Sequence, residues 1–129
     1  MPHPDRRVVT ALARSAAAAF GLALSAVAAQ AASYEFLAAP QVNLNRIYRL
    51  DKATGEVAAC QYGLKEGTIG VTICYPPGEG ATAQNPSEYQ LIASRHEQEA
   101  GVFRADLRNG GVSICYVYNE AVVCTPAAK

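Results

Sequence analysis

The sequence predicts an all-β protein made of two tandem, four-stranded antiparallel units. Three observations support this prediction. Residues 34–60 align without a gap on residues 89–115, and short runs of β-branched and aromatic residues are bounded by Gly, Asn and Pro. No helical pattern of any length follows residue 31. The chain has 129 residues, half of them apolar, which is a typical length for a single domain.

Residues 1–31 have the layout of a secretory signal peptide. An N-terminal region with three arginines is followed by an apolar run over residues 15–29 and a small-x-small cleavage site at 29–31. The apolar run is too short to span a membrane well. Both the general secretory route and the twin-arginine route stay open, because Arg6-Arg7 is followed by residues that fit the second signal poorly. We expect a periplasmic or secreted protein whose single domain is 32–129.

The chain that remains after cleavage carries eight basic and ten acidic residues, a net charge of −2. Nucleic-acid binding needs a basic surface that neutralises phosphates, so a nucleic-acid partner is not expected. No sequence pattern points to a cofactor, and the partners that stay open are a small molecule, a glycan, a protein or a second copy of this chain.

The internal repeat appears when the sequence is shifted by 55 residues. Seven of the 27 aligned positions are identical, which favours duplication of one supersecondary unit. The units cover about 34–76 and 89–126 and are joined by the loop 77–88. The identical positions in the first unit are Tyr34, Ala38, Arg49, Asp51, Gly55, Val57 and Cys60.

Each unit is expected to contain four short strands. The connections 51–55 and 106–110 are hairpin signals, because Asp accepts hydrogen bonds from the turn backbone and Gly adopts a positive φ. Residues 94–100 are compatible with one helical turn, but the matching segment contains Pro40. The expected strands are 34–39, 45–51, 56–62 and 68–75, then 89–94, 101–107, 111–118 and 121–125.

The four cysteines predict two disulfides, because an even number in a short exported chain is typical of cross-linked domains. A two-residue loop at 119–120 places Cys115 directly opposite Cys124 in a non-hydrogen-bonded pair. By the repeat, Cys60 pairs with Cys74 across the longer hairpin. The spacing of these residues contains no CxxC motif, so a metal site is not expected.

The segment RIYRLDKATGEVAAC resembles the hairpin between inner and outer strands in quinoprotein-like β-propeller blades. Such repeats usually carry a tryptophan after the turn, and this chain has none. The resemblance therefore implies a blade-like four-stranded shape and no cofactor site. The organisation in two units is also similar to that of small lectins built of two blades, which complete a propeller by oligomerising.

The packing of the two units is left open by the sequence. Two sheets can pack face to face as a sandwich or join as an eight-stranded barrel, which gives a monomer. Alternatively, two or three chains can assemble a propeller of four or six blades, since two blades cannot close one alone.

No catalytic constellation is visible, and we expect no enzyme activity. The only histidine after residue 31 is His96, which lies in the polar connection 94–100 and is expected to be solvated. The motifs of serine hydrolases, zinc proteases and nucleotide-binding loops are all missing.

The candidate ligand-binding residues are two repeated pairs, Tyr48 with Arg49 and Phe103 with Arg104. Arginine offers a fork of donors and an aromatic ring a flat face. The expected function is a non-catalytic binding or envelope-associated module. The first alternative is a lectin-like carbohydrate-binding protein. The second is a protease inhibitor that uses the segment 76–88 as its reactive loop.

Overall fold

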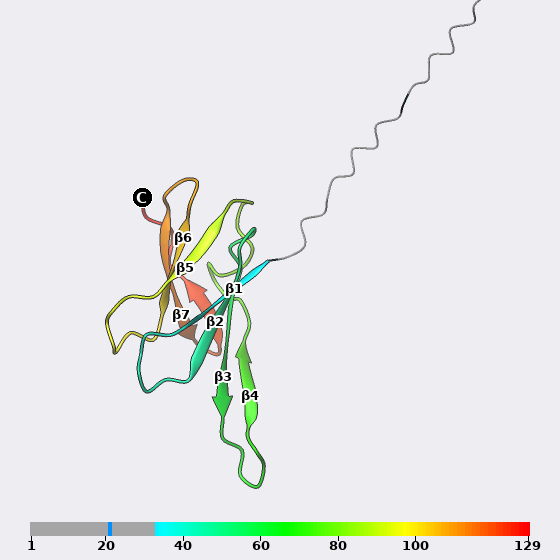
Figure 1. Cartoon of the computed structure of the whole chain (residues 1–129), viewed down its shortest axis with the longest axis vertical. Helices are drawn as coiled ribbons and strands as arrows, with labels where there is room; N and C mark the ends of the chain where they lie inside the picture. The colour runs from blue at the N-terminus through cyan, green and yellow to red at the C-terminus, as the bar shows by residue number, and fades with distance from the viewer. Residues whose placement is uncertain (1–20, 22–32) are drawn as a thin grey trace, which may run out of the picture.

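The structure, a computed structural model, describes residue 21 and residues 33–129, so the predicted signal peptide lies outside the described residues apart from Gly21. Residues 33–129 form two four-stranded antiparallel sheets and no helix (Figure 1). Within the described part of the chain, no helix is long and apolar enough to cross a membrane. The predicted all-β architecture of two four-stranded units is confirmed.

Each sheet is a simple meander in which neighbouring strands follow one another along the chain. The two sheets remain separate in their strand pairing and pack on each other, as in a sandwich. The first sheet contains β1 (Tyr34–Ala38), β2 (Arg46–Asp51), β3 (Val57–Gly63) and β4 (Val71–Tyr75). The second sheet contains β5 (Tyr89–Ile92), β6 (Val102–Asp106), β7 (Val112–Tyr118) and β8 (Ala121–Cys124).

The hairpin turn of each unit is built by its aspartate. The Asp51 carboxylate accepts hydrogen bonds from the backbone N–H groups of Ala53 at 2.9 Å and Thr54 at 3.1 Å. Gly55 closes the turn at φ 75°, a conformation that costs glycine nothing sterically. Asp106 and Gly110 repeat the arrangement, with φ 77° at the glycine. The turn chemistry read from the sequence is therefore confirmed in both units.

Both disulfides join directly opposite residues of neighbouring strands. Cys60 bridges Cys74 between β3 and β4, and Cys115 bridges Cys124 between β7 and β8. The Cα atoms are 4.0 Å and 4.1 Å apart, as expected for non-hydrogen-bonded antiparallel pairs. The predicted pairing is confirmed. The second bridge is buried in the core, whereas Cys74 of the first is exposed.

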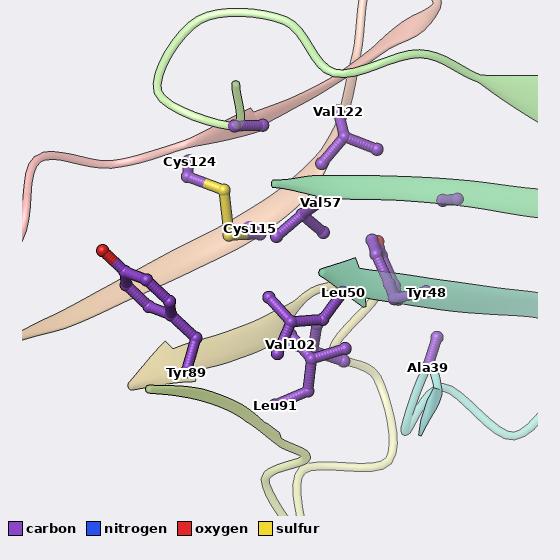
Figure 2. Close-up of a cluster of buried hydrophobic side chains, with 12 residues drawn as sticks. Ala39, Tyr48, Leu50, Val57, Tyr89, Leu91, Val102, Cys115, Val122 and Cys124 are labelled. Carbon is purple, nitrogen blue, oxygen red and sulfur yellow. A yellow bond between two sulfur atoms is a disulfide. The ribbon is translucent and has the colours of Figure 1, made fainter. Parts of the chain in front are cut away.

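The core lies between the sheets, but the two units do not bury equivalent faces. The first sheet buries Tyr48, Leu50 and Val57, and Figure 2 shows these side chains pointing toward the second sheet. The second sheet buries Val102 and Cys115, which align with Ile47 and Cys60 rather than with Tyr48 and Ala59. Because successive strand residues point to opposite faces, a shift by one position exchanges the faces.

The exposed fractions of aligned residues show this exchange clearly. Tyr34 is 49 % exposed and its counterpart Tyr89 is 5 % exposed, while Ile47 is 42 % exposed and Val102 is fully buried. The two units therefore stack face to back, in the same sense, rather than as mirror-like halves of a sandwich. We call the two faces that point away from the other sheet the outer faces.

The connection between the units is fastened to both sheets. The N–H of Val57 donates to the carbonyl of Ala81 at 2.9 Å, and Ala81 is fully buried. Pro77 forms a parallel bridge with Val122, and the N–H of Gly78 donates to the Val122 carbonyl at 2.7 Å. By contrast, the β3–β4 hairpin projects away from the body of the protein (Figure 1).

The difference in burial predicts unequal contributions of the disulfides to stability. Each bridge closes a short loop, which is worth about 3 kcal/mol by loop-closure entropy. Removing the buried bridge with Cys115→Ala/Cys124→Ala should cost about 1–2 kcal/mol more than Cys60→Ala/Cys74→Ala, because it also leaves a cavity. Urea unfolding of the two double variants measures this difference, and equal losses would contradict it.

The β7–β8 turn carries a residue that its conformation disfavours. Asn119 and Glu120 adopt φ values of 48° and 62°, and glutamate lacks the short polar side chain that helps asparagine in this region. Glu120→Gly should raise the free energy of unfolding by about 1 kcal/mol. Asn119→Gly is the matched control and should change it by less than about 0.5 kcal/mol, since asparagine tolerates this region. Thermal unfolding of both variants provides the comparison.

Candidate functional site: a polar cavity built on Arg104

The four residues proposed from sequence as paired ligand sites occupy three different places. Tyr48 and Arg104 are both buried between the sheets. Arg49 lies on the outer face of the first sheet, and Phe103 lies half-buried on the outer face of the second. The structure therefore does not assemble two equivalent surface sites. The reason is the face-to-back stacking, which turns aligned residues toward different environments.

Arg104 is the most deeply buried charged residue among the described ones, with 6 % of its surface exposed. Its Nη1 donates to the carbonyl of Gly55 at 2.7 Å, and its Nη2 donates to the carbonyl of Gly80 at 3.0 Å. One carbonyl belongs to the hairpin turn of the first unit and the other to the connection. The guanidinium thus ties three segments together at one end of the sheets.

The remaining proposed residues make local contacts. The Tyr48 hydroxyl donates to the carbonyl of Ala100 at 2.6 Å, which links the first sheet to the connection between β5 and β6. Burial raises the pKa of this hydroxyl, so it stays protonated as a donor. The Arg49 guanidinium lies 5.2 Å from the centroid of the Tyr34 ring, a cation–π contact on the outer face of the first sheet.

A cavity of about 150 Å³ opens beside Arg104. Tyr89 of β5, the strands β6 and β7, the end of the connection, the turn after β6 and the C-terminal tail line it. Arg104 and Ser113 are opposite each other in the β6–β7 register and form the inner wall. Its polar side chains are those of Gln84, Asn85, Arg104, Asp106, Asn109 and Ser113. The cavity is therefore partly enclosed, polar and cationic at its base.

The charges around the cavity are well defined. The Asp106 carboxylate accepts a hydrogen bond from the Ser87 hydroxyl at 2.6 Å, which is the main reason that its pKa lies below the ordinary range. Burial raises the pKa of Tyr89, and the nearby Asp106 charge raises it further. Burial lowers the pKa of Arg104, but a guanidinium still keeps its proton at neutral pH.

The cavity also contains residues that the sequence analysis assigned to a linker. Gln84 and Asn85 come from the connection between the units, and the Asn85 carbonyl accepts a hydrogen bond from the Tyr89 hydroxyl at 2.6 Å. Ser113 was also missed, although a hairpin closed at 106–110 places it opposite Arg104. The register of the predicted hairpin was the signal that could have found Ser113.

His96 lies away from this cavity. It is exposed in the connection between β5 and β6, as expected from its polar surroundings. Among the described residues, no group of three or more His, Cys, Asp and Glu side chains is arranged to hold a metal ion.

The chain matches no protein-family model, no curated protein and no solved structure. Function is therefore inferred from the geometry of this protein alone.

Arg104 should be far more important for stability than an exposed arginine. Arg104→Met keeps an unbranched, mostly apolar stem but leaves the carbonyls of Gly55 and Gly80 without their donor. The expected loss is about 2–4 kcal/mol of unfolding free energy, from two buried acceptors left unpaired. Arg95→Met, at an exposed loop position, should cost less than about 0.5 kcal/mol. Urea unfolding measures both, and a small loss at Arg104 would contradict this role.

The hydrogen bond from Ser87 should control the ionisation of Asp106. Ser87→Ala removes the donor, so the Asp106 pKa should rise toward the ordinary aspartate range. The pKa of Asp106 is lower in the folded state than in the unfolded state. The ionised carboxylate therefore stabilises the folded protein at pH values above the ordinary aspartate pKa. This contribution disappears as the pH falls through the folded-state pKa. Carboxyl NMR titration measures the shift. Ser94→Ala, whose hydroxyl accepts from the His96 N–H, is the control.

Proposed function

We propose that the protein is an exported, non-catalytic binding module that takes a small polar ligand in the Arg104 cavity. The single observation that carries the proposal is the buried guanidinium at the base of a partly enclosed polar cavity. The two intramolecular disulfides suit an oxidising compartment such as the periplasm or the extracellular space.

The chemistry of the cavity favours a neutral or anionic ligand with several hydroxyl or carboxyl groups. Arg104 offers a fixed charge and donors, Asp106 offers acceptors, and the two asparagines offer both. The volume suits one ring-sized group and is smaller than the usual pocket of a drug-sized ligand. The ligand is therefore a small molecule or the end group of a longer one.

The ionisation of the cavity supports binding rather than catalysis. Among the described residues that line the cavity, the only carboxylate is that of Asp106, which already accepts hydrogen bonds from Ser87 and two backbone N–H groups. These donors hold its pKa low, so it is a poor proton donor or acceptor near neutral pH. No histidine or free thiol is found in the cavity wall within the described part of the chain.

A lectin-like function is the first alternative and a more specific form of the same proposal. A terminal monosaccharide has the ring size and hydroxyl groups that this cavity can accommodate. A protease inhibitor is the second alternative. The segment that it would present is held by the hydrogen bond between Val57 and the buried Ala81, so an inhibitor would have to release it.

A ligand screen by NMR and tyrosine fluorescence tests the proposal. The protein has no tryptophan, and Tyr89 borders the cavity. We expect saturable shifts of the residues around Arg104 with monosaccharides or small hydroxy acids. Asn85→Ala and Ser113→Ala should each weaken this binding about tenfold, corresponding to about 1.4 kcal/mol for one lost hydrogen bond.

Thr72→Ala is the control variant, because Thr72 is exposed on the first sheet and away from this cavity. It should leave the affinity unchanged. Absence of saturable shifts at the cavity across both ligand classes would overturn the proposal. Binding to a protease that is abolished by cleavage within 76–88 would instead favour the inhibitor.

A further inference from the structure

We propose that a second copy of this chain packs its second sheet on the outer face of the first sheet, and so repeats the stacking seen inside one chain. The outer face of the first sheet carries Tyr34, Phe36, Ile47, Arg49 and Tyr62. The outer face of the second sheet carries Ile92, Phe103, Val112, Ile114 and Tyr116. The argument for this contact does not use the proposed ligand, although the contact reaches Gly110, whose neighbours Asn109 and Gly111 line the cavity.

The outer faces expose large apolar side chains, as an interface does when its partner is missing. Tyr34, Phe36 and Tyr62 are about half exposed, and Ile47 is 42 % exposed in the middle of the same sheet. A contiguous set of large apolar side chains of this kind marks an interaction surface. The counterparts of Tyr34, Phe36 and Ile47 in the second unit are all buried against the first sheet.

The contact between the two sheets inside one chain shows which residues would meet in the contact between two copies. Inside the chain, the Tyr89 ring lies on Gly55, so close that a Cβ atom there would be 3.0 Å from it. Gly110 is the counterpart of Gly55 and nothing lies within 4 Å of the same point. Tyr34, the counterpart of Tyr89, is exposed. Stacking a second copy in the same way would place its Tyr34 on Gly110.

The two equivalent arginines, Arg104 and Arg49, show the same relation as the two tyrosines: one is used in the internal contact and the other is exposed. Arg104 donates to the carbonyl of Gly55 across the internal contact, and its identical counterpart is Arg49 on the open face. Within one chain, the Arg49 guanidinium lies over the ring of Tyr34, on the exposed outer face. In the stacked pair, its guanidinium would reach the carbonyl of Gly110 in the other copy. Three of the identities between the units, at Tyr, Arg and Gly, thus belong to one contact.

The C-terminal tail supplies the other part of the acceptor surface. In the first unit, the N–H of Val57 donates to the carbonyl of Ala81, next to the Gly80 carbonyl that Arg104 uses. In the second unit, the N–H of Val112 donates to the carbonyl of Ala128 at 2.8 Å. The tail therefore lies along β7 as the connection lies along β3. In the stacked pair, its backbone carbonyl groups would accept hydrogen bonds from an arginine, as the Gly80 carbonyl does.

A contact of this type is heterologous, because it joins two different faces. Each copy uses its first sheet toward one neighbour and its second sheet toward another. Repetition closes into a ring when the rotation between units allows it, with at least two copies. The partner is thus a second copy of this chain, and both outer faces become buried.

Light scattering after size-exclusion chromatography of the purified, non-reduced protein tests the proposal. The wild-type protein should have at least twice the mass of one chain. Ile47→Asp and Val112→Asp each place a charge on one outer face, at a residue of a central strand. Each should weaken assembly on the order of a hundredfold or more and give a monomer. Ile69→Asp is the matched control, because Ile69 is 97 % exposed in the β3–β4 hairpin, and it should assemble like the wild type.

A mixing experiment tests the head-to-tail geometry. The Ile47→Asp variant retains an intact second sheet, and the Val112→Asp variant retains an intact first sheet. An equimolar mixture should therefore form a dimer with one chain of each variant, detected by native mass spectrometry with one variant isotopically labelled. A self-complementary interface between like faces would give no such rescue and would overturn the proposal.

Wild-type protein that stays monomeric at high concentration would also overturn it, as would assembly that both variants leave intact. Circular dichroism establishes that the variants are folded. If Ile47→Asp does not fold, Phe36→Asp changes the same face at the first strand, where the side chain is 58 % exposed. Because these variants lie outside the Arg104 cavity, loss of assembly and loss of ligand binding can be distinguished.

Discussion

The buried guanidinium of Arg104 is the interaction on which the relative placement of the two sheets depends. A charged group away from water is tolerated only where hydrogen bonds replace its hydration. Here the replacement comes from the Gly55 and Gly80 carbonyls, one in the first hairpin turn and one in the connection. These acceptors lie where they do because Asp51 shapes the turn and Ala81 is buried beside Val57. The same arrangement leaves the polar cavity at the edge of the contact.

Much of the fold could be predicted because its determinants are local. The hairpin turns follow from an aspartate and a glycine four residues apart, and the Cys115–Cys124 bridge follows from counting back from a two-residue loop. The repeat extended these inferences to the first unit, including the longer hairpin closed by Cys60 and Cys74. Each of these features needs only the chain within a few residues of the turn.

The buried face of each sheet could not be predicted, because both faces of the central strands carry a large apolar side chain and the arginine of β6 lies on the buried face. In β2, Ile47 points outward and Tyr48 inward, while in β6 Val102 points inward and its neighbour Phe103 outward. Side-chain alternation assigns a face only when one face is polar. The pairing of Tyr48 with Phe103 as equivalent ligand residues assumed equal environments, and the stacking makes these environments different.

The same ambiguity explains what was missed at the candidate site. Arg104 was selected together with Arg49 as a repeated residue, and nothing in the local sequence separates the one that is buried from the one that is exposed. Gln84 and Asn85 belong to a segment whose Pro, Gly and Ser content is typical of a linker, yet tertiary contacts hold it against both units. Long-range packing, which no local pattern records, therefore determines most of the cavity.

Face-to-back stacking gives a physical reason for the apolar character of both faces. In a face-to-face pair, each unit buries one face and the outer faces can become polar without cost. In a face-to-back pair, the two units bury opposite faces, so one ancestral sequence must suit both positions. The pattern explains why Tyr34 and Arg49 match their buried counterparts Tyr89 and Arg104. Polar replacements of Phe36, Ile47 and Ile92 would be tolerated in an isolated chain, and the large apolar side chains kept there are consistent with faces that are covered.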